Sequence, residues 1–244
     1  MTDYKLPNNA LSGKVILVTG AGDGIGKQAA INYAKYGATV ILLGRTTEKL
    51  EQVYDEIESA GGPQPAIIPL NLLHLSEEQA HQIAETIEQE FGRLDGLLHN
   101  ASTLGEMTPI ANYPVETWLN VMQVNVNSAF VLTQALLPVL RNADKASIVF
   151  TSSGVGNKGR AYWGAYSVSK FATEGFAQVL ADELENTNVR VNVINPGATR
   201  TKMRAKAYPA EDSNQLKTPD TLMPLYTYLM SDESLEVKGE RFNG

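Results

Sequence analysis

The sequence of 244 residues has no cysteine, only 7% aromatic residues and few histidines. Without cysteine, disulfides, zinc–thiolate sites and thiol nucleophiles are excluded, and nothing else in the sequence indicates a metal site. A cysteine-free chain suits a reducing compartment, so we expect a cytoplasmic protein. Residues 1–12 are polar and lack a long apolar run, so we expect neither a signal peptide nor a membrane contact there.

Positive charge is also scarce, since the formal net charge is −7 and the pI is about 5.1. An acidic surface repels phosphate backbones, which argues against a nucleic-acid partner. Hydrophobic residues make up 43% of the chain, enough for one large core. The length fits a single α/β domain over residues 1–244, in which residues 1–12 form an N-terminal arm.

Short, largely apolar runs alternate with helical patterns along the whole chain. Such runs are typical of buried strands, and they lie at 14–19, 39–43, 66–70, 94–99, 146–151 and 189–194. The helical patterns lie at 24–36, 46–60, 76–91, 115–140, 162–186 and 218–230. Continuous apolar strands indicate a parallel sheet that is covered on both faces. With right-handed crossovers this predicts a doubly wound, Rossmann-like, three-layer α/β/α fold, which binds ligands at the carboxyl ends of its strands.

A glycine-rich turn separates the first strand from the first helix. Glycines there permit a tight turn and a close approach of a pyrophosphate, and the helix that follows offers N–H groups to the phosphates. A glycine-rich run alone would also fit an ordinary strand–helix turn. The pattern here is Thr-Gly-x-x-x-Gly-x-Gly, and its candidate cofactor-binding residues are Thr19, Gly20, Gly22, Asp23, Gly24, Ile25 and Gly26.

Tyr166 and Lys170 form the only Tyr-x-x-x-Lys pair of the chain. Their spacing places both on one face of a helix. A free tyrosine has a pKa near 10, and a nearby ammonium group lowers the pKa of a phenol, which would suit proton transfer. An isolated pair could equally be a core tyrosine and a surface lysine. Ser153, directly after the fifth strand, favours a catalytic group, although a shifted register would replace it with Ser152.

Together these motifs resemble the short-chain dehydrogenase/reductase family, from Lys14 to about Gly239, and within it bacterial reductases of unassigned substrate. The resemblance implies that Tyr166 is the general acid/base and that Lys170 lowers its pKa. It implies that Ser153 hydrogen-bonds the substrate oxygen. Asn125 matches the asparagine that holds a water between the lysine and solvent, with Asn127 as the neighbouring alternative.

The resemblance also implies further cofactor contacts. Asn100 and Ala101 match the family's Asn-Asn-Ala-Gly, while His99 and Ser102 depart from it; a lone histidine there is more often structural. Pro196 and Gly197 match a Pro-Gly turn, after which Thr199 and Thr201 would close over the nicotinamide. Asn71 stands where an Asp usually contacts adenine. Residues 199–217 are expected to cover the substrate, and a seventh strand could begin at Arg241.

The position after the second strand indicates NADP(H) in preference to NAD(H). Enzymes that use NAD place an acid there for the ribose hydroxyls. Gly44 leaves space instead, and Arg45 offers a planar fork of donors to a 2′-phosphate. Asp23 argues against this preference, and Arg45 could be a solvated surface residue.

The sequence therefore predicts an oxidoreductase that moves a hydride between NADP(H) and a carbonyl or secondary alcohol. Candidate pocket residues suggest a small, apolar substrate: Trp163, Tyr162, Met107, Met203 and Tyr208. A nucleotide-binding regulator on the same fold remains the alternative, and a methyltransferase would need an acid after the second strand. The helical segments 115–140 and 162–186 are too apolar for one buried face each, so we expect a homodimer or homotetramer.

Overall fold

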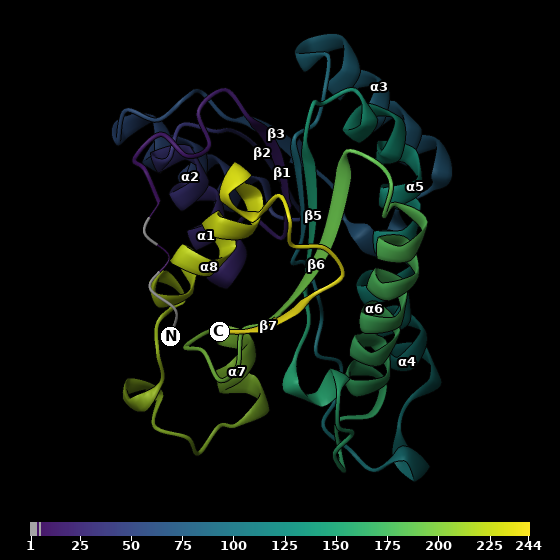
Figure 1. The fold of residues 1–244 in the computed structure, drawn as a ribbon. Coiled ribbons are helices and arrows are strands. Elements are labelled where there is room, and N and C mark those ends of the chain that lie inside the picture. The colour runs from purple at the N-terminus through teal and green to yellow at the C-terminus, as the bar shows by residue number, and fades with distance from the viewer. Residues whose placement is uncertain (1–3, 5) are drawn as a thin grey trace.

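A seven-stranded parallel sheet forms the centre of the computed structural model, which describes residue 4 and residues 6–244 (Figure 1). Its strand order is β3-β2-β1-β4-β5-β6-β7. The strands are β1 (Val15–Thr19), β2 (Thr39–Gly44), β3 (Ala66–Pro69), β4 (Gly96–His99), β5 (Ala146–Thr151), β6 (Val189–Asn195) and β7 (Arg241–Asn243). Six of them were predicted, and Pro69 indeed lies in an edge strand, where its missing N–H costs no ladder bond.

Helices cover both faces of the sheet, which confirms the doubly wound, three-layer fold. One face carries α1 (Gly24–Lys35), α2 (Thr47–Ser59) and α8 (Met223–Met230). The other carries α3 (Glu77–Phe91), α4 (Val115–Met122), α5 (Ser128–Arg141) and α6 (Gly164–Glu183). The short helix α7 (Lys202–Ala207) stands beyond the sheet on the segment after β6 (Figure 1).

The strand order reverses between β1 and β4, which pair side by side in parallel. The connection after β1 runs to one face of the sheet and the connection after β4 to the other. The two loops therefore diverge at the carboxyl ends of these strands and leave a crevice between them. This is the edge of the sheet at which the sequence places its candidate ligand-binding residues.

The helix predicted over 115–140 is interrupted. A π-helical turn, Gln123–Asn127, separates α4 from α5, so that Asn125 lies within the irregular turn. One extra residue in such a turn leaves an otherwise regular helix locally widened, a feature that hydrophobic periodicity does not reveal. Pro138 lies inside α5.

The predicted helix boundaries shift for local reasons. Helix α6 begins at Gly164 rather than at residue 162, because Tyr162 has a φ of +71°, outside the helical region. Ser76 caps α3 in a full capping box with Gln79. Thr46 occupies the N-cap position of α2, but its side chain makes no capping hydrogen bond. Residues 219–222 form a 3-10 helix before α8.

Both ends of the described chain pack onto the fold. Of the predicted arm, residues 1–3 and 5 lie outside the described residues, whereas Leu11 is fully buried and Tyr4 stacks on Tyr228. Strand β7 extends the sheet by pairing with β6, so a seventh strand does begin at Arg241. Within the described part of the chain, no helix is long and apolar enough to cross a membrane.

Candidate active site

A cavity of about 630 Å³ opens at the carboxyl edge of the sheet. Its walls come from the glycine loop, from the segments after β2 to β6, and from α7. The structure brings nearly all predicted site residues to this one cavity: Gly20, Gly22, Asp23, Gly24, Ile25, Arg45, Asn71, Asn100, Ala101, Ser153, Tyr166, Lys170, Pro196, Gly197, Thr199 and Thr201. Three predicted residues do not line it, namely Thr19, Gly26 and Asn125.

The glycine loop is shaped by contacts that a side chain would prevent. Gly20 has a φ of +70°, and a Cβ on Gly26 would collide with the carbonyl oxygen of Gly20. Thr19 ties this loop to the segment after β4, because its Oγ1 accepts the N–H groups of Asn100 and Ala101 at 3.0 Å each. Thr19 and Gly26 therefore set the shape of the loop rather than line the cavity.

Asp23 lies at the mouth of the cavity between two lysines. Its Oδ2 accepts from Lys49 Nζ at 2.7 Å and from Lys202 Nζ at 2.9 Å. Partial burial opposes ionisation, but the lysines outweigh it and lower the pKa of Asp23 to about 2. The acid that argued against a 2′-phosphate is thus neutralised by cations. Sequence reasoning missed both lysines, although Lys49 lies only four residues from the exposed Arg45.

Ser153, Tyr166 and Lys170 form the polar floor of the cavity. Burial raises the pKa of Tyr166 to about 12, while hydrogen bonding to Ser153 and Ser102 lowers it. Burial also disfavours the charged form of Lys170 and lowers its pKa to about 8, although the nearby charge of Glu174 acts in the opposite direction. Lys170 is not among the groups that set the pKa of Tyr166 here, so the expectation that the lysine lowers this pKa stays a prediction. Desolvation of the phenol dominates, because Lys170 Nζ lies 5.6 Å from the ring centroid and donates to Thr151 O.

The structure separates the two neighbouring serines. The Ser152 hydroxyl is buried and donates to Glu174 Oε1 at 2.5 Å. Ser153 caps the 3-10 helix Gly154–Gly156 and lies close enough to Tyr166 to lower the pKa of its phenol. Of the two candidates, Ser153 is thus the one placed beside the phenol. Ser102, treated in the sequence only as a departure from the family pattern, adds a second hydroxyl there.

Asn125 is buried in the π-helical turn, and both the oxygen and the nitrogen of its side-chain amide are hydrogen-bonded. Its Oδ1 accepts from Thr103 N at 2.7 Å, and its Nδ2 donates to Thr103 O and to Ser169 Oγ. It lines a small second cavity that also touches Lys170 and Thr151. Asn127 is exposed and bonds Gln123 instead, so of the two asparagines only Asn125 lies near the lysine.

His99 is a buried residue of the core rather than of the cavity. Its Nε2 lies 2.8 Å from Thr133 Oγ1, and its ring stacks on Phe150. Burial lowers the pKa of His99 to about 3, so the ring is neutral at pH 7. Among the residues that the structure describes, no group of three or more His, Asp or Glu side chains is arranged to hold a metal ion.

The loops after β3 and β6 complete the cavity wall. Asn71 caps the 3-10 helix Leu72–His74 by accepting from Leu73 N at 3.2 Å. Thr199 donates to Pro196 O at 3.2 Å and closes the Pro-Gly turn. Thr201 caps α7. These side chains hold the backbone in place while the residues themselves face the cavity.

An apolar cluster adjoins Tyr166 beneath α7. It contains Leu104, Val155 and Trp163, with Met107, Met203, Ala207 and Tyr208 packed against it. Of the predicted pocket residues, Trp163 and Met203 line the cavity, whereas Met107 and Tyr208 pack against the apolar cluster without lining it. Tyr162 is 58% exposed and does not line it.

Comparison with known proteins agrees with this geometry. The family model of short chain dehydrogenases matches residues 14–212. An uncharacterised oxidoreductase of Escherichia coli K12, YciK, is 54% identical over 240 residues, which cover 98% of this chain and 95% of that protein. Two solved short chain dehydrogenases, from Shigella flexneri in complex with NADP and from Escherichia coli CFT073 in complex with NADPH, are each 54% identical with a TM-score of 0.95. They cover 97% and 98% of this chain, which covers 99% of each of them.

Proposed function

The chain belongs to the short-chain dehydrogenase family of oxidoreductases, and we propose that it transfers a hydride between NADP(H) and a carbonyl or secondary alcohol of a small, apolar substrate. The observation that carries this proposal is that Ser153, Tyr166 and Lys170 share one cavity with the glycine loop. A nucleotide-binding regulator would have no use for this polar floor.

The cavity has the features that a 2′-phosphorylated dinucleotide requires. The glycine loop lets the backbone approach a pyrophosphate closely. Gly44 leaves room beyond β2, and Arg45, Lys49 and Lys202 supply positive charge at the same end of the cavity. The NADP and NADPH complexes of two relatives support the same choice. Asn71, Asn100, Ala101, Pro196, Gly197, Thr199 and Thr201 would hold the rest of the dinucleotide along the wall. When bound, the nicotinamide ring supplies or accepts the hydride.

The chain's own residues handle the proton. A phenol with a pKa of about 12 is protonated at neutral pH, so Tyr166 can give its proton to a carbonyl oxygen as that oxygen gains charge. Ser153 orients the same oxygen by a hydrogen bond. Lys170 is charged at pH 7 because its pKa is about 8, and its positive charge stabilises the phenolate that remains. Asn125 supports the path by which a proton returns from solvent through the small cavity beside Lys170.

Residues 199–217 would serve as the lid of the substrate pocket within a single domain of residues 1–244. Helix α7 brings Met203 over the apolar cluster, and Lys202 joins the lid to Asp23 of the glycine loop. Trp163 and Met203 then enclose the reacting carbon in an apolar environment. Such a pocket favours substrates without charge next to the carbonyl.

Helices α4, α5 and α6 expose large apolar side chains, which favours a homodimer or homotetramer. The residues are Val115, Leu119, Phe130, Val168, Phe171 and Val179. They lie on the helices that cover one face of the sheet, and such a surface is unusual for a monomer. Light scattering at micromolar concentration should show an assembly, and a monomer would contradict this part of the proposal.

The assay follows NADPH absorbance with a panel of small uncharged ketones, including cyclohexanone. Ketone-dependent oxidation of NADPH is expected. Failure to bind NADPH in a fluorescence titration would overturn the proposal.

Titration of NADPH and NADH into the wild type and into Arg45→Ala tests the preference for NADP(H) over NAD(H). Tighter NADH binding by the wild type would reverse it, and an unchanged ratio in the variant would remove Arg45 from that role.

A further inference from the structure

Glu174 is a buried acid directly behind the catalytic group. It is only 8% exposed, although carboxylates are almost never buried unless they are paired. Its Oε1 accepts from Ser152 Oγ at 2.5 Å, and its two oxygens accept from Arg241 Nε at 2.9 and 3.2 Å. Three elements therefore meet at one carboxylate: the end of β5, helix α6 and strand β7.

One branch of this arrangement leads to the cofactor wall. Arg241 Nη1 donates to Asn243 Oδ1 at 2.9 Å, and Asn195 Nδ2 donates to the same oxygen at 2.9 Å. Asn195 Oδ1 in turn accepts from Gly197 N at 3.2 Å. A continuous series of hydrogen bonds thus joins Glu174 to the Pro196–Gly197 turn.

The other branch leads to the catalytic side chains. Lys170 precedes Glu174 by one helical turn on α6, so the two lie on one face of the helix. Ser152, which Glu174 holds, is the residue before Ser153. A Cβ on Gly156 would lie 2.9 Å from both Lys170 Cβ and Ser152 Oγ. Glycine at this position therefore lets α6 approach the end of β5 closely.

We propose that Glu174, paired with Arg241, is the positioning residue of this active site: it keeps Ser152 turned inward so that Ser153 faces the substrate, and it holds the charge of Lys170 under the phenol. The inference rests on the proposed function for the role of Ser153 and Lys170. Its geometric basis is the junction of β5, α6 and β7 at one buried carboxylate.

The Glu174 carboxylate and the Arg241 guanidinium have opposite effects on the pKa of Lys170. Burial lowers the pKa of Lys170 and Glu174 raises it. The other titratable groups around the lysine are Tyr166, which is neutral at pH 7, His99 across the small cavity, and Tyr226, which bonds Thr151. Removing Glu174 should therefore lower the pKa of Lys170, whereas removing Arg241 should raise it.

The test measures the pH at which NADPH affinity falls, followed by NADPH fluorescence. An ammonium group in the cavity attracts the anionic probe, so the affinity of the wild type should fall near pH 8, where Lys170 loses its proton. In Glu174→Gln this midpoint should move down by about one pH unit, which is a tenfold change in the protonation equilibrium. In Arg241→Met it should move up. The double variant should return close to the wild type.

Glu183→Gln is the matched control, because Glu183 lies on the same helix and is exposed. Its midpoint should not change. Shifts in the same direction for both single variants, or no shift, would overturn the proposal and leave a merely structural ion pair. If Arg241→Met does not fold, Glu174→Gln and the double variant still decide the matter, since neither leaves the Glu174 carboxylate buried without Arg241.

Turnover separates this inference from the function on which it rests. With a ketone of the panel, Glu174→Gln should lose about fivefold in kcat at pH 8 with little change in KM, because the protonated fraction of Lys170 falls from about one half to about one tenth. A wild type that oxidises no NADPH while the affinity midpoints still move in opposite directions would contradict the proposed function alone. A normally active wild type with unmoved midpoints would contradict the role of Glu174 alone.

Discussion

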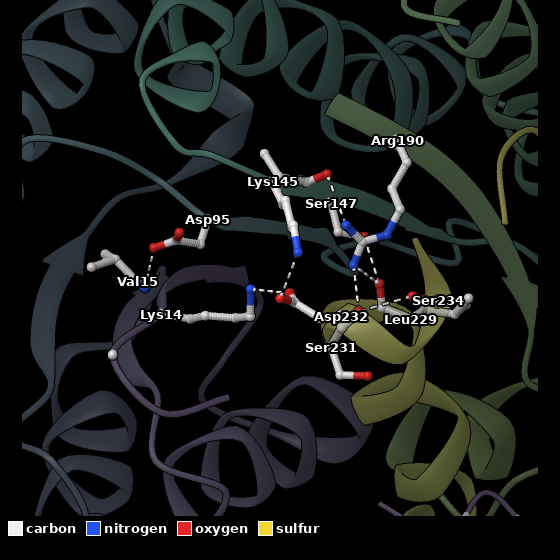
Figure 2. Close-up of polar contacts among 12 residues, drawn as sticks. Lys14, Val15, Asp95, Lys145, Ser147, Arg190, Leu229, Ser231, Asp232 and Ser234 are labelled. Atoms are coloured by element: carbon white, nitrogen blue, oxygen red, sulfur yellow. Dashed lines mark hydrogen bonds and ion pairs between the residues drawn. The ribbon is translucent and has the colours of Figure 1, made fainter. Parts of the chain in front are cut away.

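The two edges of the sheet use polar side chains in opposite ways. At the carboxyl edge, Tyr166 and Ser153 face a cavity of about 630 Å³. At the amino edge, polar side chains hydrogen-bond backbone groups and one another within the protein, although the buried Nε of Arg190 has no partner (Figure 2). Arg190 of β6 is 3% exposed and donates to Ala146 O, Leu229 O and Ser231 O at 3.3, 3.2 and 2.7 Å.

At the amino edge, side chains hydrogen-bond the free backbone groups at the start of β1 and at the end of α8. Ser147 Oγ donates to Leu229 O at 2.6 Å, and Asp95 accepts the N–H of Val15 at 2.8 Å (Figure 2). Asp232 links Lys14 and Lys145. The backbone groups named here are paired within the protein, whereas the loops at the carboxyl edge place polar side chains on the wall of a cavity. Substitutions at the carboxyl edge should therefore cost activity, and substitutions at the amino edge should cost stability.

The largest effect should come from Tyr166→Phe at the carboxyl edge. Loss of the proton donor should reduce ketone turnover by about a hundredfold or more, since general acid catalysis contributes about that much. NADPH affinity and the thermal midpoint should stay near wild type, because only a hydroxyl facing the cavity is lost. The measurements are steady-state kinetics and a melting curve. Near-normal turnover would remove Tyr166 from its proposed role.

Arg190→Met should show the opposite pattern at the amino edge. Three carbonyl oxygens lose a charged donor, so the free energy of unfolding should fall by roughly 2–3 kcal/mol. Part of that cost is offset because burial already disfavours the charge and lowers the pKa of Arg190 to about 10. Urea denaturation measures the loss, with Arg141→Met, at an exposed position of α5, as control. A large loss of turnover in folded protein at 25 °C would contradict the separation of the two edges.

His99, at the carboxyl end of β4, should make the stability of the protein sensitive to mild acid. Its folded pKa of about 3 lies below the ordinary value of 6.5, so the unfolded chain binds the proton first. The stabilisation is complete above pH 6.5 and is lost progressively as the pH falls toward 3. At pH 5 the loss should be about 2 kcal/mol. The melting temperature of His99→Gln should fall less between pH 7 and pH 5 than that of the wild type, and exposed His81→Gln serves as control. Equal slopes would show that another group is responsible.

The smallest effect should come from Asp232→Asn. Asp232 and Lys145 are each about half exposed, with side-chain exposures of 48% and 47%, so solvent screens their attraction. The expected loss of unfolding free energy is below about 1 kcal/mol, and 1 M NaCl should abolish the difference from wild type. A loss as large as that of Arg190→Met would mean that the exposed bridge, rather than the buried arginine, holds the end of α8.

Much of the fold could be predicted because alternating apolar runs and helical patterns have few three-dimensional solutions. The six predicted strands all form, within two residues of their expected ends. The π-helical turn at Asn125 and the positive φ of Tyr162 were not predictable, since neither changes the pattern of apolar residues. The choice between Ser152 and Ser153 was also beyond the sequence, because it depends on which side of the strand faces Glu174.

The sequence by itself determined the parallel sheet, the glycine loop and the pairing of Tyr166 with Lys170, because these depend on local conformation and on spacing along one helix. Only the tertiary structure decided what surrounds them. Burial sets the pKa of Tyr166 above its ordinary value, and contacts across many residues join Asp23 to Lys202 and Glu174 to Arg241. Desolvation and long-range charge pairing depend on the packing of the whole chain, which no local pattern records.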